Sequence, residues 1–202
     1  MIRIAVLASG RGSNLEALFE ALAARGDAEI ILVASDRAEA QALDRARARG
    51  VEAAVIAPGD ENGLLELLER ARIDWLVLAG YLRRIPSGLV RRYRNRILNI
   101  HPALLPAHGG KGMYGERVHR AVLEARERTS GASVHLVDEE YDRGPVLAQA
   151  EVPVEPGDTP ATLAARVLEA EHRLLPAVVI AAVEGRIRVA GDRAWIEPQE
   201  ER

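Results

Sequence analysis

Two side chains that could do chemistry stand two positions apart near the middle of the chain. They are Asn99 and His101, and they close the run Arg96-Ile97-Leu98-Asn99-Ile100-His101-Pro102. Because side chains alternate along a strand, Asn99 and His101 are expected on one face. Pro102 has no N–H for a ladder and should end the strand. An amide donor and a titratable imidazole then lie at the carboxyl end of a strand, where open α/β sheets bind ligands.

The surroundings of this pair favour a functional role over a structural one. A lone buried histidine is most often a core residue that a neighbour satisfies. Here the strand is followed by residues 104–115, which contain one proline and four glycines. An irregular loop of this length is usually functional or mobile. We therefore interpret Asn99 and His101 as part of an active site.

A carboxylate partner for the imidazole is expected in the acidic turn at residues 138–145. Asp142 is followed there by Gly144 and Pro145, which would fix the turn. The turn could also be a solvated acidic loop. The residue pattern alone does not choose between Asp142 and the other acids of the turn, which are Asp138, Glu139 and Glu140.

A glycine turn near the N-terminus predicts an anion site. The apolar run 2–8 is expected to be a strand and residues 15–25 a helix, and Gly10-Arg11-Gly12-Ser13-Asn14 lies between them. Backbone N–H groups and the helix dipole then converge on one point. The alternative is a tight turn in which Ser13 or Asn14 caps the helix.

The same turn departs from the dinucleotide fingerprint. Leu15 stands where the third glycine belongs, although Asp36 follows the second strand, near the place of a ribose-binding acid. A phosphate site is therefore favoured over a bound NAD.

Alternating strand and helix patterns predict the fold. Further strands are expected at 30–34, 51–57, 73–79, 132–137 and 146–154, and a hairpin at 186–196. Helices are expected at 38–49, 64–72, 86–94 and 116–128, with a last helix that Thr159 or Asp158 caps and that ends near 184. The pattern predicts an α/β fold with an open, mostly parallel Rossmann-like sheet, helices on both faces, and an antiparallel extension in the C-terminal half.

Composition excludes several classes of protein. The 202 residues carry a formal net charge of −3, which argues against a nucleic-acid or anionic-membrane protein. There is no cysteine, and no apolar run approaches the roughly 20 residues of a membrane helix. Gly10 and Arg11 interrupt any signal-peptide core. Together these features predict a cytoplasmic protein. The histidines show no metal-ligand spacing and no G-x-S-x-G elbow is present, so we expect neither metal nor serine-hydrolase chemistry.

Three motifs resemble the formyltransferase family. Residues 99–106, Asn-Ile-His-Pro-Ala-Leu-Leu-Pro, are similar to its signature N-I-H-P-S-L-L-P. The stretch from Ser133 to Val137 and on to Asp142-Arg143-Gly144-Pro145 resembles a second signature, whose Asp precedes Gly-Gly-Pro. With the opening residues 9–15, the order and spacing resemble the folate-dependent glycinamide ribonucleotide transformylase branch of the family.

The resemblance implies a reaction and a set of roles. The amine of glycinamide ribonucleotide attacks the formyl carbon of 10-formyltetrahydrofolate, in purine synthesis and without a metal. Asn99 and an imidazolium at His101 would stabilise the oxyanion, and Asp142 would stabilise the charged ring and accept protons from the amine. The resemblance assigns substrate binding to Gly12, Ser13, Asn14 and Glu171, and folate binding to Leu82, Arg83, Arg84, Ile85 and Asn99.

The resemblance also implies one formyltransferase domain over residues 1–202. Residues 1–98 would form the ribonucleotide-phosphate half, and residues 99–202 the catalytic and folate-binding half. Small-molecule substrates are its expected partners, with neither nucleic acid nor membrane, and a homodimer stays open. The chain departs from the family pattern at three places. Leu168 stands where some relatives have a lysine or glutamine, residues 58–63 lack an arginine, and residues 110–115 replace the more usual Pro-Gly-Leu-His loop.

The sequence leaves three rival functions. Methionyl-tRNA formyltransferase carries an additional C-terminal domain, and an acidic chain suits tRNA poorly. Formyltetrahydrofolate hydrolase shares similar residues but carries a regulatory N-terminal domain. A nucleotide-binding module without chemistry would need only the first half of the chain.

Overall fold

The computed structural model describes residues 1–57 and 59–199. Pro58, where the predicted loop 58–63 begins, lies outside the described residues. The chain divides into two compact units, one of residues 1–99 and one that begins at Ile100. Each unit is described below by itself.

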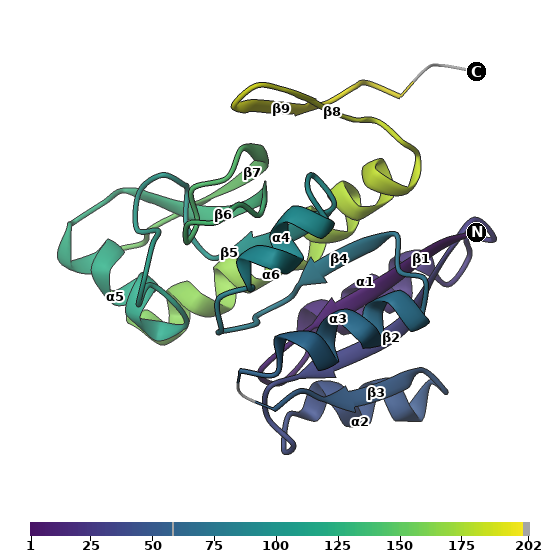
Figure 1. Cartoon of the computed structure of the whole chain (residues 1–202). Helices are drawn as coiled ribbons and strands as arrows, with labels where there is room; N and C mark the ends of the chain where they lie inside the picture. The colour runs from purple at the N-terminus through teal and green to yellow at the C-terminus, as the bar shows by residue number, and fades with distance from the viewer. Residues whose placement is uncertain (58, 200–202) are drawn as a thin grey trace. The chain divides into compact units, whose positions relative to one another are not determined.

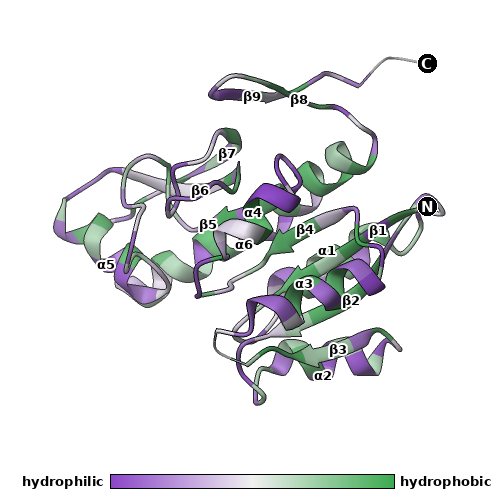
Figure 2. Cartoon of the chain, in the orientation of Figure 1, coloured by the Kyte–Doolittle hydropathy of each residue, from purple (hydrophilic) through white to green (hydrophobic). Residues whose placement is uncertain are grey.

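The first unit is built on a parallel sheet. Its strands are β1 (Ile2–Leu7), β2 (Ala28–Ser35), β3 (Glu52–Val55) and β4 (Trp75–Leu78), followed by the start of β5 (Ile97–His101). They pair in the order β3-β2-β1-β4-β5, and every pair is parallel. The inner strands are apolar, as their colouring in Figure 2 shows, and residues 4–7 of β1 are fully buried. Strands covered on both faces are expected to be continuously apolar in this way.

Four helices cover this sheet. They are α1 (Ser13–Leu22), α2 (Gln41–Ala48), α3 (Glu61–Arg70) and α4 (Ser87–Arg92). Figure 1 shows α1 and α2 on one face and α3 and α4 on the other. Helix α3 begins three residues before the predicted start, because the Asp60 carboxylate caps it by accepting the N–H of Gly63 at 2.8 Å.

The second unit contains an antiparallel pair of strands and two helices. Strands β6 (Thr129–Leu136) and β7 (Val146–Pro153) pair antiparallel, and α6 (Pro160–Val183) packs on both of them. Helix α5 (Glu116–Glu124) packs on α6, and β8 (Ile187–Ala190) and β9 (Arg193–Ile196) form the predicted hairpin. The predicted fold class, mostly parallel with an antiparallel C-terminal extension, is confirmed. No helix within residues 1–57 and 59–199 could cross a membrane.

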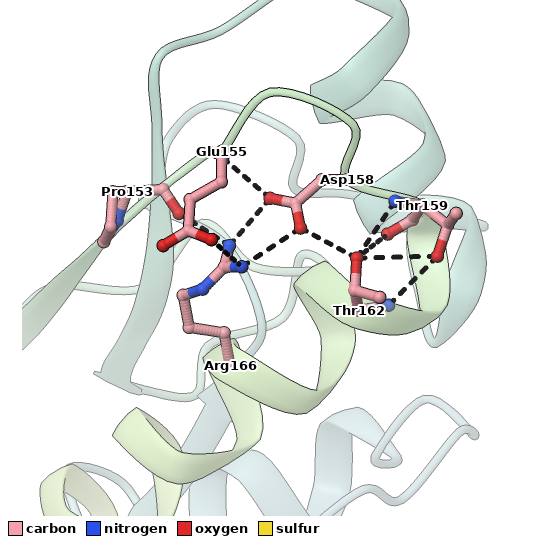
Figure 3. Close-up of polar contacts among 6 residues, drawn as sticks. All are labelled: Pro153, Glu155, Asp158, Thr159, Thr162 and Arg166. Atoms are coloured by element: carbon pink, nitrogen blue, oxygen red, sulfur yellow. Dashed lines mark hydrogen bonds and ion pairs between the residues drawn. The ribbon is translucent and has the colours of Figure 1, made fainter.

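The start of α6 decides between the two predicted caps. Thr159 is the N-cap, and its side chain accepts the N–H of Thr162 (Figure 3). Asp158 instead binds Arg166, with contacts of 2.7 and 3.0 Å, and accepts the N–H of Glu155 at 2.8 Å. The Arg166 guanidinium holds the pKa of the Asp158 carboxyl far below its ordinary value. This charged pair fixes the turn between β7 and α6.

Candidate active site

The second unit brings the predicted imidazole and one acid of the acidic turn together. Nδ1 of His101, at the end of β5, lies 3.5 Å from Oδ2 of Asp142. The two side chains are only 4% and 11% exposed. The other ring nitrogen of His101, Nε2, lies 2.8 Å from the carbonyl oxygen of His108. Both nitrogens therefore face acceptors, which is an arrangement that an imidazolium satisfies best.

Asp142 has two further partners in the same unit. The N–H of Gly110 donates to Oδ2 at 2.9 Å, and Nε2 of His135 lies 3.6 Å from Oδ1. The Asp142 backbone has a φ of 54°, a left-handed conformation that aspartate and asparagine adopt more readily than most residues. Both carboxylate oxygens therefore have partners, and an imidazole ring lies near each of them.

This geometry selects among the acids that the sequence left open. Asp142 is the acid that the structure places against His101, whereas Asp138 accepts the N–H of Glu140 at 2.8 Å. His135 was not predicted as a site residue. Its position within the second signature, on the strand that leads into the acidic turn, was the available signal.

The charge states follow from burial and from these contacts. Burial alone would raise the pKa of Asp142, but His135, the charge of His101 and the N–H of Gly110 outweigh it and lower the pKa. Burial lowers the pKa of His101 below its ordinary value, because the Asp142 carboxylate and the His108 carbonyl offset only part of this effect. Asp142 is therefore ionised at neutral pH and supplies the charge that favours protonation of His101.

A second network fixes the start of the loop after β5. The Ser133 hydroxyl donates to the carbonyl of Ala103 at 2.6 Å and accepts the N–H of Leu105 at 2.9 Å. The Gln149 side-chain amide donates to the Leu105 carbonyl at 3.0 Å and to Ser133 at 2.8 Å. Neither Ser133 nor Gln149 was predicted as a site residue. Both hold the backbone that follows His101.

In the first unit, the glycine turn is shaped by a neighbouring helix. Gly12 is the N-cap of α1 in a left-handed conformation with a φ of 74°, and no side chain caps the helix. The alternative that Ser13 or Asn14 caps α1 is therefore wrong, since both already lie in its first turn. A Cβ atom on Gly12 would lie 2.9 Å from Cα and Cβ of Ala42 on α2. The glycine is required by this close approach and by its backbone conformation.

The predicted folate segment is tied to residues next to the glycine turn. The N–H of Leu82 donates to Oγ of Ser9 at 3.0 Å. Ser9 in turn donates to Oδ1 of Asp36 at 2.5 Å, and Nε of Arg83 donates to Oδ2 of Asp36 at 2.8 Å. Both Asp36 oxygens are engaged within the unit. This arrangement argues against Asp36 as the ribose-binding acid of a dinucleotide site.

The remaining predicted residues lie within their own units. Asn99 is half-buried on β5 and belongs to the first unit, and Ile85 is buried after the Leu82–Arg84 stretch. Glu171 lies within α6 of the second unit and is 8% exposed. No group of three side chains that could hold a metal ion occurs among the described residues.

Comparisons with known proteins identify the family of this chain. Residues 2–179 match the family model described as formyl transferase. The chain is 43% identical over 195 residues to the chloroplastic phosphoribosylglycinamide formyltransferase of Arabidopsis thaliana, which covers 92% of this chain and 67% of that protein. It is 35% identical over 206 residues to the phosphoribosylglycinamide formyltransferase of Escherichia coli K12, with 98% and 95% of the two chains covered.

A solved structure shows the same fold. Glycinamide ribonucleotide transformylase 1 of Symbiobacterium toebii superposes with a TM-score of 0.90 at 39% identity, over 98% of this chain and 95% of that one. Some matching proteins are much longer. The chain spans 62% of the length of the Vigna unguiculata chloroplastic enzyme and 14% of a trifunctional purine biosynthetic protein of Drosophila pseudoobscura pseudoobscura.

Proposed function

This chain belongs to the formyl transferase family, and on that premise we propose that it transfers the formyl group of 10-formyltetrahydrofolate to the amine of glycinamide ribonucleotide. The observation that carries the proposal is the pairing of His101 with Asp142, at 3.5 Å, within the residues that match the family model. The printed names of the relatives and of the solved structure support the choice of acceptor.

The proposed reaction begins with attack of the neutral amine on the formyl carbon. A C–N bond forms, and the formyl oxygen becomes an oxyanion. Asn99 and His101 lie two positions apart on β5, so strand alternation is expected to put both side chains on one face. An amide N–H and a ring N–H could then stabilise this oxygen. Each ring nitrogen of His101 now faces a protein acceptor. One of them must exchange that acceptor for the formyl oxygen when the substrates bind.

Asp142 has two tasks in this proposal. Its negative charge favours the protonated form of His101, and its carboxylate accepts the proton that the amine loses, directly or through water. The folate nitrogen gains a proton as the bond between it and the formyl carbon breaks. Contacts from His135 and Gly110 hold the carboxylate in place for both tasks.

Substrate binding is assigned to separate segments. The first turn of a helix presents backbone N–H groups without helical partners, so Gly12, Ser13 and Asn14 at the start of α1 suit the ribonucleotide phosphate. Glu171 is proposed to bind the ribose. Leu82–Ile85 and Asn99 are proposed to bind folate. Residues 1–98 are proposed as the ribonucleotide-phosphate half of one domain.

Two further expectations concern the protein as a whole. A cytoplasmic location is a prediction from the sequence, and a homodimer is left open.

Folate absorbance tests the proposal directly. The protein is mixed with 10-formyltetrahydrofolate, with and without glycinamide ribonucleotide, and formation of deformylated folate is followed. We expect turnover only when the ribonucleotide is present. Turnover without it would instead indicate a hydrolase. A lack of turnover in both mixtures, with tight binding of NAD, would support a dinucleotide module.

A further inference from the structure

The first unit contains a buried carboxylate that has no role in the proposed reaction. Asp36 follows β2 directly, and its side chain is 5% exposed. An isolated buried carboxylate is costly, so its partners indicate what it is for. Those partners are Ser9, just after β1, and Arg83, in the loop after β4.

Ser9 connects Asp36 to the backbone of the same loop. The Ser9 hydroxyl donates to Asp36 at 2.5 Å and accepts the N–H of Leu82 at 3.0 Å. The Ser9 N–H also donates to the carbonyl of Gly80 at 3.0 Å. The loop that leaves β4 is therefore held at residues 80, 82 and 83 by the ends of β1 and β2.

The charges at this point are consistent with a permanent pair. Burial would raise the pKa of Asp36, but the Ser9 hydroxyl and the Arg83 guanidinium outweigh it and lower the pKa. The neighbouring Tyr81 is affected in the opposite sense, because burial and the Asp36 charge raise the pKa of its hydroxyl. Asp36 therefore remains a carboxylate and Tyr81 remains neutral over the physiological range.

We propose that Asp36 is a positioning residue for folate, which acts through Ser9 and Arg83 to fix the backbone of residues 80–83 in the conformation that binds the co-substrate. The proposal rests on the proposed function, which assigns Leu82–Ile85 to folate. Asp36 need not touch folate. Its contribution is to remove the freedom of a loop that would otherwise be ordered only on binding.

Two substitutions separate the two arms of this arrangement. In Asp36→Asn the side-chain oxygen can still accept from Ser9, whereas the amide N–H groups cannot accept from Arg83. In Ser9→Ala the N–H of Leu82 loses its acceptor and Asp36 loses its donor. Both should raise the KM for 10-formyltetrahydrofolate by about three- to tenfold, as expected for loss of one ordinary hydrogen bond. The KM for glycinamide ribonucleotide and kcat should change much less.

A double-mutant cycle tests whether Asp36 acts through Arg83. Arg83→Gln alone should raise the folate KM, and Asp36→Asn should add little in that background. The matched control is Glu69→Gln, which removes the carboxylate from an exposed pair of the same unit, where Nε of Arg92 lies 3.1 Å from Glu69. This control should leave both KM values unchanged.

Equilibrium titration of each variant with tetrahydrofolate, together with thermal unfolding, completes the test. The proposal predicts weaker folate binding by Asp36→Asn at an unchanged affinity for the ribonucleotide. If the wild type is active and Asp36→Asn binds folate with unchanged affinity, the proposal is wrong. Equal weakening for both ligands, with a lower Tm, would also overturn it, because the role would then be structural. A wild type that neither binds folate nor transfers formyl would contradict the proposed function instead.

Discussion

Nδ1 of His101 lies 3.5 Å from Oδ2 of Asp142, and the two side chains are only 4% and 11% exposed. At this distance the carboxylate opposes the effect of burial on the ring, since burial disfavours the imidazolium and a nearby negative charge stabilises it. The protonation of His101 therefore depends on Asp142. This dependence can be measured by comparing the wild type with a variant that lacks the Asp142 charge.

Asp142→Asn is expected to impair the chemical step and leave the fold intact. Asparagine tolerates the φ of 54° at this position, so the turn should be preserved. Loss of the charge should lower kcat by on the order of 10²-fold or more, and it should lower the pKa of His101 further. Steady-state kinetics and an NMR titration of the ring would measure the two effects.

The matched control for this variant is Asp138→Asn. It changes an acid of the same turn whose contact, to the N–H of Glu140, an asparagine oxygen can keep. We expect wild-type kcat. Near-normal turnover in Asp142→Asn would refute the assignment and move attention to Asp138, Glu139 or Glu140.

Gly12→Ala and Gly10→Ala should differ sharply in stability. A Cβ on Gly12 would meet Ala42 at 2.9 Å and would require a left-handed backbone, whereas a Cβ on Gly10 has no atom within 4 Å. Overpacking and strain of this kind cost about 1–3 kcal/mol each. Urea unfolding should therefore show a clear loss for Gly12→Ala and little change for Gly10→Ala. Equal stabilities would mean that α2 does not approach the turn as described.

Buried His119 should make stability fall on acidification. Its Nδ1 has no hydrogen-bond partner among the described residues, and burial, followed by the charge of His101, lowers its pKa. Below the ordinary pKa of histidine, near 6.5, the unfolded chain binds a proton that the folded chain resists, so stability is lost as the pH falls toward the folded pKa. His119→Leu should raise Tm more at pH 5 than at pH 8. Parallel shifts at both pH values would disprove this coupling.

Lys111 is predicted to approach the bound ribonucleotide. It is exposed in the loop before α5, and it directly follows Gly110, whose N–H donates to Asp142. It is also the one lysine of the sequence, between two glycines. Lys111→Ala should weaken ribonucleotide binding, with a loss that shrinks as salt screens the contact, and Lys111→Arg should recover part of it. Wild-type affinity of Lys111→Ala at low salt would identify an ordinary surface lysine.

The sequence predicted the fold class well because strand and helix patterns are local. The alternation of apolar strands with helices capped or stopped by glycine leaves few arrangements for the chain. Boundaries were less accurate where a single side chain decides them, as Asp60 does for α3. The choice of Thr159 over Asp158 as a cap likewise depends on Arg166, two turns further along α6.

The placement of Asn99 and His101 two positions apart on one strand could be predicted, because strand patterns are local. Contacts between distant segments could not be predicted in this way. The selection of Asp142, and the contacts of His135 and Gly110, depend on how the turn folds back toward β5. Gly12 was interpreted through the phosphate, whereas the structure shows that packing against Ala42 also requires it. Such long-range contacts leave no periodic signal in the sequence.

Transfer of a labelled formyl group tests the central claim most directly. The protein is incubated with 10-formyltetrahydrofolate carrying an isotopic label in the formyl carbon, together with glycinamide ribonucleotide, and the label is located by NMR. The account predicts that it appears as an N-formyl amide on the ribonucleotide, at a rate that Asn99→Ala, His101→Ala and Asp142→Asn each reduce by on the order of 10²-fold or more. Label recovered as free formate, or left on folate while the protein binds both substrates, would contradict it.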